Sequence, residues 1–405
     1  MADVPADYGK GSGMDTAIVL FTRDLRVHDN PALAAACQLA RRVVPLFVRD
    51  RAVRAGDPRQ AFLAGALADL RGSLRERGGD LVVREGDPVA ETLRLAREVG
   101  AEGVAVARDV SRFAQRRYDR LAEACGAHRI ALKGFDSVTV VAPFALRPAG
   151  GDHYKVFSPY WRRWRELPHR AVLPAPSKVE LPAGVAVGRL PGGADRAPVP
   201  GGERAARERM RRWDGSDYVE GHDDLAGDRT SRLSPYLHFG CLSPVELIGK
   251  AGVPEEFVRQ VCWRDFYAQV CAAFPQIVDT PYRPGAHDEW RGSDADFDRW
   301  AAGETGVPLV DAGMRQLAAQ GWMHNRARLV TASYLTKDLG VDWRRGAAHF
   351  MAALVDGDVA NNYGNWQWVA GTGNDTRPYR KFNPHRQAER YDPSGGYRQR
   401  WLDRV

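Results

Sequence analysis

The first third of the chain alternates short apolar runs with amphipathic stretches. Four apolar runs predict parallel strands, because strands covered on both faces read as continuous hydrophobic segments: residues 17–21, 43–48, 81–83 and 104–107. Three stretches between or after them show helical apolar spacing: residues 60–77, 88–99 and 112–125. This alternation predicts a doubly wound α/β domain with a parallel sheet.

The pattern changes twice further along the chain. Residues 143–202 are rich in Pro and Gly, which is typical of an interdomain linker, although a Tyr-Trp-Arg-Arg-Trp island interrupts them at residues 160–164. Helical spacing without strands follows over residues 203–213, 244–250, 255–273, 310–339 and 345–354. The domains expected are a disordered segment (1–15), an α/β domain (16–142), a linker (143–202) and an all-α domain (203–405).

The turn after the first predicted strand reads Thr22-Arg23-Asp24-Leu25-Arg26. It contains no Gly-x-Gly-x-x-Gly, the glycine pattern with which dinucleotide-binding folds approach a pyrophosphate. The α/β domain is therefore not expected to bind NAD.

Composition narrows the class of protein. Of the 405 residues, 27% are charged and 44% hydrophobic, and no run is long enough to span a bilayer. The N-terminal residues lack the apolar core of a secretion signal, so a cytoplasmic location is expected. The five cysteines are odd in number and have no metal-ligand spacing, which predicts packing residues, no disulfide framework and no metal site.

The net charge of +7 suggests an anionic partner. Residues 376–405 carry eight basic side chains against three acidic ones, hence 8 − 3 = +5. On charge alone, a solvated tail and a phosphate-binding surface explain this segment equally well. The interleaved aromatic residues and glycines favour nucleic acid.

Two predicted helix faces combine aromatic and polar side chains. Gln260, Trp263, Arg264 and Tyr267 fall at positions i, i+3, i+4 and i+7. An amphipathic packing stripe with a flanking ion pair is an equally good explanation of that face alone. A second face repeats the arrangement with Trp322, Asn325, Arg326 and Leu329. Together the two faces predict a pocket for a flat heterocycle.

Two neighbouring indoles, Trp366 and Trp368, would point to nearly opposite sides of a helix. Core packing therefore does not explain both of them, although a single indole is more often a packing residue.

Two carboxylates, Asp356 and Asp358, flank Gly357 and would repel each other without cations or hydrogen-bond donors. A metal ion is one explanation, and ring N–H or ribose hydroxyl donors are the preferred one, with Arg264 and Arg328 as countercharges. Residues 230–234 (Thr-Ser-Arg-Leu-Ser) precede Pro235 and suit either a phosphate-binding loop or an ordinary helix cap.

Six segments together resemble the DNA photolyase and cryptochrome family, and most closely its class I cyclobutane pyrimidine dimer photolyases. The matching segments are residues 24–30, 154–164, 230–234, 263–267, 321–326 and 356–368. The resemblance extends from about Ala17 to Arg400. It implies an N-terminal Rossmann-like α/β domain of the photolyase type and a C-terminal all-α FAD-binding domain.

The resemblance also implies that FAD binds in a folded, U-shaped conformation. A buried guanidinium with its own carboxylate can hold the negative charge of reduced flavin, and Asn362 takes the place that faces flavin N5. The implied cofactor-binding residues are Tyr218, Thr230, Ser231, Arg232, Leu233, Ser234, Phe257, Arg264, Asn325, Arg328, Asp356, Gly357, Asp358 and Asn362.

The implied reaction is electron transfer from light-excited reduced FAD to a cyclobutane pyrimidine dimer in UV-damaged DNA. Photolyases are a known case of enzymes that take their target base out of the stack. Trp263 and Trp368 would sandwich the extruded rings, and the basic tail would hold phosphates. The implied DNA or lesion contacts are Gln260, Trp263, Arg264, Tyr267, Asn325, Arg326, Leu329, Trp368, Arg380 and Gln387.

Three further indoles match the electron chain of the family, which reduces oxidised flavin in light. They are Trp366, Trp343 and Trp290, in order from flavin to surface. With Asn362 they are the residues expected to carry the electron chemistry.

Some positions depart from the family pattern. Gln260 stands where many dimer-repairing members have Glu, Leu329 where they often have Met, and Phe257 where Trp is common. Gln at the first position also occurs in members that repair the (6-4) photoproduct, but those usually have a His pair where this chain has Asn325 and Leu329.

Two other functions therefore stay open beside dimer repair and (6-4) repair: a cryptochrome-type blue-light receptor and a non-enzymatic DNA-binding module. A second, light-harvesting chromophore, folate or deazaflavin, is expected in the α/β domain of such proteins. A monomer without an obligate protein partner is the expected state.

Overall fold

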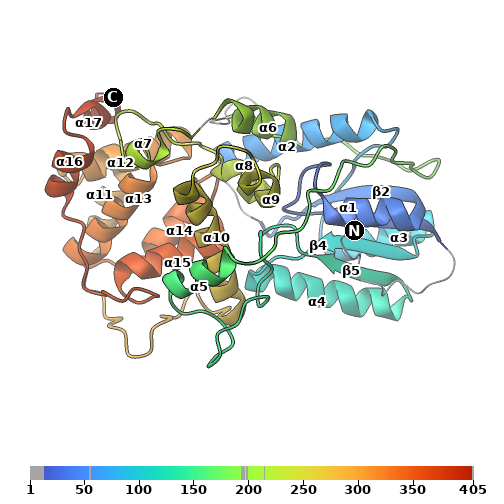
Figure 1. Cartoon of the computed structure of the whole chain (residues 1–405), viewed down its shortest axis with the longest axis horizontal. Coiled ribbons are helices and arrows are strands. Elements are labelled where there is room, and N and C mark those ends of the chain that lie inside the picture. The colour runs from blue at the N-terminus through green and yellow to red at the C-terminus, as the bar shows by residue number, and fades with distance from the viewer. Residues whose placement is uncertain (1–12, 54–55, 193–196, 198, 214, 404–405) are drawn as a thin grey trace.

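The computed structural model describes residues 13–53, 56–192, 197, 199–213 and 215–403, and Figure 1 shows an α/β domain beside a helical one. The α/β domain contains a five-stranded parallel sheet in the order β3-β2-β1-β4-β5. Its strands are β1 (Met14–Phe21), β2 (Ala40–Arg49), β3 (Val82–Glu85), β4 (Gly103–Ala107) and β5 (Ala131–Phe135). The predicted doubly wound sheet is confirmed. Residues 1–12 of the segment expected to be disordered lie outside the described residues, and β1 begins at Met14.

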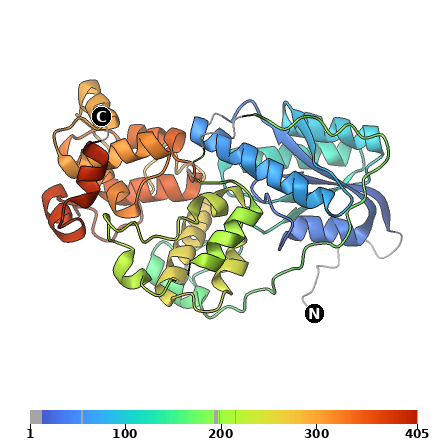
Figure 2. The same cartoon turned by 90° about the horizontal axis from the view of Figure 1, so that it is seen from above.

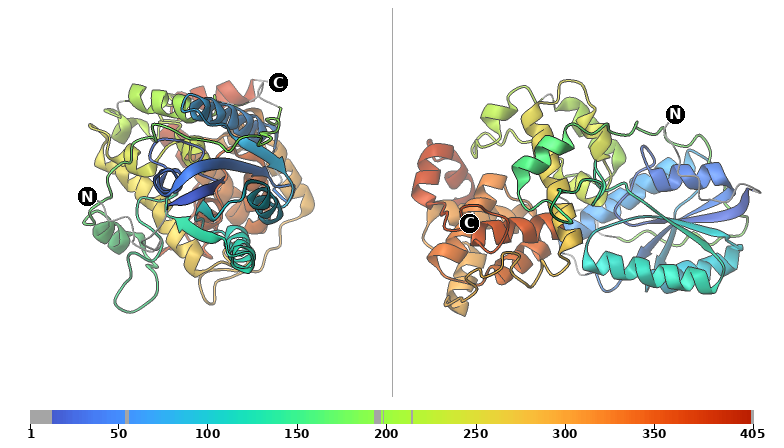
Figure 3. Two further views of the ribbon diagram at one scale, coloured as in Figure 1. Left: turned by 90° about the vertical axis from the view of Figure 1, so that its right-hand side faces the viewer. Right: turned by 60° about the horizontal axis from the view of Figure 1, so that its bottom comes forward.

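Helices cover both faces of the sheet, as Figure 3 shows. Val19 and Phe21 of β1 belong to the core shared with α1 (Pro31–Leu39) and α2 (Asp57–Arg75). Ile18 and Leu20 belong to the core shared with α3 (Pro88–Val99) and α4 (Arg112–Ala127). Burial of successive side chains on opposite faces explains why the strands have no polar alternation.

Two elements of this domain were not predicted from sequence. β5 reads Ala-Leu-Lys-Gly-Phe, and α1 is a short alanine-rich helix directly after the first turn. β5 is an edge strand, and most of it is half-buried, so its sequence lacks the apolar run of an inner strand.

The linker contains a short helix and then runs back along the α/β domain. α5 (Phe157–Trp164) buries Tyr160, Trp161 and Trp164 against the helical domain. Farther on, the backbone N–H of Val83 in β3 donates to the carbonyl of Val187 at 2.8 Å. The aromatic island is therefore a structural part of the helical domain.

The second domain is helical, as predicted. Its helices in the described chain are α6 (Glu203–Arg212), α7 (Tyr218–Gly221), α8 (Ser234–Phe239), α9 (Pro244–Ile248), α10 (Glu255–Ala273), α11 (Asp294–Ala302), α12 (Pro308–Gln320), α13 (Asn325–Ser333), the π-helix η2 (Tyr334–Asp338), α14 (Trp343–Ala353), α15 (Val359–Ala370), α16 (Pro384–Tyr391) and α17 (Gly396–Leu402).

The single helix predicted over residues 310–339 is wrong. α12 ends at Gln320, because Gly321 adopts a left-handed φ of +60° and a Cβ there would lie 2.7 Å from Pro58. α13 then starts anew with His324 as its N-cap. Trp322 therefore lies in the connection between α12 and α13, and not on one helix face with Asn325 and Leu329.

An aromatic contact joins the two domains. Phe62 of α2 stacks on Phe239 of α8 with ring centroids 4.9 Å apart, and Figure 2 shows the long helix α2 reaching the helical domain. Arg59 of the same helix donates to the carbonyl oxygen of Leu354 at 2.5 Å. These contacts fix the helical domain against the sheet.

The five cysteines are packing residues rather than ligands or disulfide partners. All five are free thiols, and all but Cys37 are buried. Burial raises the pKa of Cys37 and of Cys125 to about 11.

Among the described helices, none is long and apolar enough to cross a membrane.

Candidate active site

A cavity of about 500 Å³ lies between α10, α13, α15 and the loop before α8. This volume is within the range of ordinary ligand sites, about 300–1,000 Å³. The residues predicted from sequence that line it are Tyr218, Thr230, Ser231, Arg232, Leu233, Ser234, Phe257, Gln260, Trp263, Arg264, Tyr267, Asn325, Arg326, Arg328, Leu329, Asp356, Asp358 and Trp368.

A smaller pocket of about 100 Å³ adjoins this cavity and shares Asn325, Arg328, Asp356 and Asp358 with it. Gly357, Asn362 and Trp366 line only the smaller pocket. The structure thus gathers every predicted cofactor residue around two connected hollows.

A partly buried ion pair lies where the two hollows meet. Nη2 of Arg328 donates to Oδ2 of Asp356 at 2.9 Å, and its Nε donates to the carbonyl of Met323 at 2.8 Å. The side chain of Asp356 is only 3% exposed. The countercharge predicted for Asp356 is therefore present, and the second hydrogen bond, to Met323, holds the guanidinium of Arg328 in place.

Asp358 has a different partner from the one predicted. Its Oδ2 accepts from Nη2 of Arg23 at 2.5 Å, and Arg23 follows β1 in the α/β domain. Arg264 instead donates to the backbone carbonyls of Val138 and Leu237. Burial alone would raise the pKa of Asp358, but the charges of Arg23 and Arg264 hold that pKa well below its usual range. Asp358 is thus ionised and connects the domains.

Four residues that line the large cavity each have one buried polar atom without a hydrogen-bond partner in the described chain. These atoms are Thr230 Oγ1, His238 Nδ1, Trp322 Nε1 and Asp356 Oδ1. Buried polar groups are normally paired, so this set fits a ligand with both donors and acceptors. FAD is such a ligand, since its heterocycles, hydroxyls and phosphates offer both.

The loop of residues 230–234 is held in a strained conformation. Arg232 has a left-handed φ of +50°, pairs with Asp228, and places its guanidinium carbon 4.1 Å from the ring centroid of Trp322. The carbonyl of Ser231 accepts from Arg209 at 2.6 Å. These contacts fix the loop at the cavity wall.

Two indoles face the large cavity from different helices, Trp263 on α10 and Trp368 on α15. Phe157 stacks on Trp263 with centroids 3.6 Å apart and an interplanar angle of 5°. The guanidinium of Arg380 lies 5.0 Å from the ring of Trp368. Tyr267 lines the same wall but is only 1% exposed, so it mainly supports Trp263.

Arg326 belongs to a network at the rim of the cavity. It donates to both carboxylate oxygens of Asp223, at 3.1 and 2.5 Å, and lies 4.2 Å from the ring of Tyr391. Its Nη1 also approaches Oε1 of Gln387 at 3.5 Å. Asp223 was not predicted, because nothing near it in sequence marks it as the partner of Arg326.

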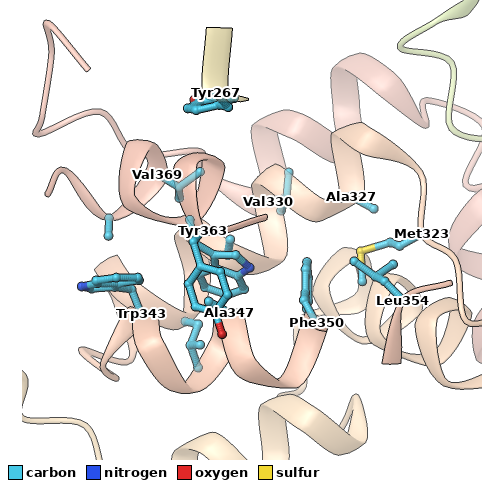
Figure 4. Close-up of a cluster of buried hydrophobic side chains, with 14 of the residues drawn as sticks. Tyr267, Met323, Ala327, Val330, Trp343, Ala347, Phe350, Leu354, Tyr363 and Val369 are labelled. Atoms are coloured by element: carbon cyan, nitrogen blue, oxygen red, sulfur yellow. The ribbon is translucent and has the colours of Figure 1, made fainter. Parts of the chain in front are cut away.

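The three indoles of the predicted electron chain differ in burial. Trp366 lines the small pocket and is 2% exposed, Trp343 is fully buried, and Trp290 is half-buried in the loop before α11. Figure 4 shows Trp343 beside Tyr363 in the core between α14 and α15, with Phe350 on the other side of Tyr363. Asn362 donates to the carbonyl of Ala347 at 2.9 Å, which fixes its amide beside this core. Trp366 thus borders the small pocket, and Trp290 is the one of the three with partial exposure.

A second cavity of about 370 Å³ lies at the carboxyl ends of β1 and β4. In the order β3-β2-β1-β4-β5 this is the point where the strand order reverses, the usual ligand crevice of open parallel sheets. Arg264, Asp358 and Asn361 border both this cavity and the larger one. Arg23, Arg108 and Asp109 also line it; their positions just after the two strands were the missed sequence signal.

Comparisons with known proteins agree with this geometry. Residues 17–179 match the family model described as DNA photolyase, and residues 257–405 match the FAD binding domain of DNA photolyase. A Streptomyces griseus protein named deoxyribodipyrimidine photo-lyase is 52% identical, over 96% of this chain and 90% of that protein.

Two solved structures have the same fold. A class III photolyase from Agrobacterium tumefaciens has a TM-score of 0.90 and 31% identity, covering 98% of this chain and 88% of its own. A Sulfolobus tokodaii photolyase, solved with two FAD molecules, has a TM-score of 0.88 and 29% identity, covering 96% and 90%. The sequence match over nearly the whole chain, the two family models and the fold establish that this chain belongs to the DNA photolyase and cryptochrome family.

Proposed function

We propose that this chain is a deoxyribodipyrimidine photo-lyase, which uses FAD and light to repair cyclobutane pyrimidine dimers in DNA. One observation carries the proposal: the aromatic pair Trp263 and Trp368 and the partly buried ion pair Arg328–Asp356 border the same cavity. A nucleobase-sized ligand against the indoles would therefore lie next to a cofactor at the ion pair. The named Streptomyces griseus relative supports the same activity.

Reduced FAD, when bound and excited by light, supplies one electron to the dimer, whose two inter-ring bonds break before the electron returns. The residues of the chain prepare the surroundings for that transfer. Arg328 would offer its positive charge to the negative charge of reduced flavin, and Asp356 keeps that partly buried guanidinium paired. Asn362 contributes a neutral amide, and residues 230–234 would hold phosphate oxygens.

The dimer must leave the DNA stack to reach this cavity, as photolyase substrates do. Trp263 and Trp368 would stack on the extruded rings, and the amides of Gln260 and Asn325 lie on the same walls. Outside the cavity, Arg380 packs over Trp368 at the start of the basic segment. The ring of Tyr379, which is 92% accessible and was not predicted from sequence, would be a further aromatic contact for DNA.

A blue-light receptor is the alternative from another functional class. It would need the flavin residues but not a cavity with two indoles and two amides, so the lesion-facing walls favour repair. Illumination of reduced, FAD-loaded protein with DNA that carries a defined thymine dimer tests the proposal, in parallel with a (6-4) substrate. Repair of the dimer alone is expected, whereas repair of only the (6-4) product, or of neither, would overturn the proposal.

The second cavity suits a light-harvesting chromophore. It lies at the switch point of the sheet and shares a wall with the large cavity, so a chromophore there would be close enough to pass excitation energy. The Sulfolobus tokodaii structure, whose two FAD molecules imply a light-harvesting cofactor, supports this use of a second site. Reconstitution with a deazaflavin and with a folate, followed by an excitation spectrum of repair, would identify the class.

Partners and location follow from the proposed substrate. UV-damaged DNA is the macromolecule that the proposed substrate requires, and a monomeric state stays part of this proposal. The enzyme must share a compartment with the chromosome, so the cytoplasmic location stays part of this proposal.

A further inference from the structure

The two outer indoles of the electron chain, Trp343 and Trp290, have oppositely charged neighbours. The guanidinium carbon of Arg344 lies 4.8 Å from the ring centroid of fully buried Trp343. The indole N–H of half-buried Trp290 donates to Oδ1 of Asp288 at 2.9 Å. A cation therefore faces the inner ring, and a carboxylate binds the outer one.

One network holds these charges in place. Nη1 and Nη2 of Arg344 donate to the two carboxylate oxygens of Asp288, at 3.0 and 2.6 Å. Nη1 also contacts Oδ1 of Asp342 at 3.1 Å, and Nε donates to the carbonyl of Asp279 at 2.7 Å. Neither charged side chain can move far without breaking several hydrogen bonds.

The carboxylate is ionised. Burial alone would raise the pKa of Asp288, but hydrogen bonds from Arg344 and Trp290 lower that pKa. Nε1 of Trp343 has no hydrogen-bond acceptor within the described residues, although it is near enough to Asp288 to contribute to the same lowering. The direct hydrogen bond of Asp288 therefore goes to the outer indole.

We propose that Asp288 and Arg344 bias the electron hole toward Trp290, so that the positive charge left by photoreduction settles at the surface and not on Trp343. In this step one electron passes from Trp290 to oxidised Trp343. Trp343 is thereby reduced, Trp290 is oxidised, and no bond forms or breaks. The proton of Trp290 stays on Nε1, hydrogen-bonded to Asp288.

Simple electrostatics gives the direction of the bias. A positive charge on the outer ring is attracted by the carboxylate at its N–H, whereas a positive charge on the inner ring is repelled by the guanidinium over its face. Asp288 and Arg344 act through the tryptophans and are positioning residues. The inference rests on the proposed function, because light-excited FAD is the acceptor that first takes an electron from Trp366.

Flash photolysis of the oxidised, FAD-loaded protein tests this bias. The readout is the lifetime of the oxidised-tryptophan absorption, measured in wild type, Asp288→Asn, Asp288→Glu and Glu289→Gln. Asp288→Asn is expected to shorten the lifetime about tenfold, equivalent to about 1.4 kcal/mol, because the hole returns more often to Trp343. Asp288→Glu restores the carboxylate and should stay near wild type. Glu289→Gln removes the same charge from the adjacent exposed side chain and should have no effect.

The thermal unfolding midpoint of each variant separates this effect from a loss of structure. An unchanged lifetime in a folded Asp288→Asn protein would overturn the inference, and so would equal shortening in Glu289→Gln. The variant Trp366→Phe tests the electron chain itself. If the oxidised-tryptophan absorption of Trp366→Phe stays at the wild-type level, electrons do not pass through Trp366. That result would refute the proposed photoreduction, independently of the role of Asp288.

Discussion

Arg328 donates to Oδ2 of Asp356 at 2.9 Å, while Oδ1 of the same carboxylate is buried without a partner in the described chain. One carboxylate oxygen thus holds the guanidinium, and the other is left to accept from a ligand. An unpaired buried acceptor costs folding free energy, about 1–3 kcal/mol. Bound FAD is expected to offset that cost.

Replacement of Arg328 by Ala should lower both the FAD content of the protein and its free energy of unfolding. It leaves the buried carboxylate of Asp356 without its cation, and breaking such a pair costs about 3–5 kcal/mol. The side chain of Arg328 is 24% exposed, so the loss of unfolding free energy is expected to lie near the lower end of this range. FAD absorbance per protein and urea unfolding measure the two effects. Arg380→Ala, an exposed arginine outside both hollows, should keep FAD, and equal loss of FAD in both variants would contradict this role.

Replacement of Trp263 or Trp368 by Ala should weaken binding of dimer-containing DNA without loss of FAD. Stacking of a base on an aromatic side chain is worth about 1–3 kcal/mol, which corresponds to roughly 5- to 150-fold in affinity. Trp→Phe variants keep a ring and should lose less. Fluorescence anisotropy with dimer-containing and undamaged duplexes measures the difference. If affinity falls equally for both duplexes, the indoles do not contact the lesion.

Gly346 makes room for Trp366, because a Cβ at Gly346 would lie 2.2 Å from the indole ring. Gly346→Ala should therefore displace Trp366 and destabilise the fold by about 1–3 kcal/mol, as overpacked cores do. Slower photoreduction of bound FAD should accompany the lower unfolding midpoint. Gly126→Ala is the matched control, since a Cβ on that residue of α4 meets no atom within 4 Å. A wild-type midpoint for Gly346→Ala would show that the ring shifts freely.

His324 should make the protein less stable in mild acid. It is 1% exposed, and its Nδ1 accepts from the backbone N–H of Arg326, so the ring must be neutral there. Burial lowers the pKa of His324 from 6.5 to about 4. Below pH 6.5 this histidine is protonated in the unfolded chain but stays neutral in the folded chain. The free energy of unfolding therefore falls between pH 6.5 and about pH 4, by about 3 kcal/mol in total.

Urea unfolding between pH 7 and pH 4 measures this effect as the difference between wild type and His324→Asn. Asn can accept the same capping hydrogen bond but does not titrate, so its stability should depend less on pH. Parallel curves for the two proteins would mean that other groups cause the acid sensitivity.

The sequence predicted the elements whose residues carry a local signal. The inner strands are continuous apolar runs, and the aromatic and polar face of α10 follows helical spacing, so both were predictable. β5 was missed because an edge strand with Lys133 and Gly134 has no such run. The break at Gly321 was missed because apolar spacing continues across it.

The site residues were recognised through family motifs, but apart from the pair Arg328–Asp356 their partners were not. Asp358 pairs with Arg23, 335 residues away in sequence, and Arg326 pairs with Asp223, 103 residues away. Such pairs depend on how the domains and helices pack, and no local pattern encodes them. The second cavity did have a local signal, in Arg23, Arg108 and Asp109 just after two strands, but its remaining walls come from the packing of both domains.

The central claim is that bound flavin and an extruded dimer share one cavity. The most direct test is the fluorescence lifetime of reduced FAD in the protein, with saturating dimer-containing DNA and with undamaged DNA. Electron transfer to an adjacent dimer should shorten the lifetime with damaged DNA only, and the shortening should weaken in Trp263→Ala. An unchanged lifetime with dimer-containing DNA bound would contradict the account.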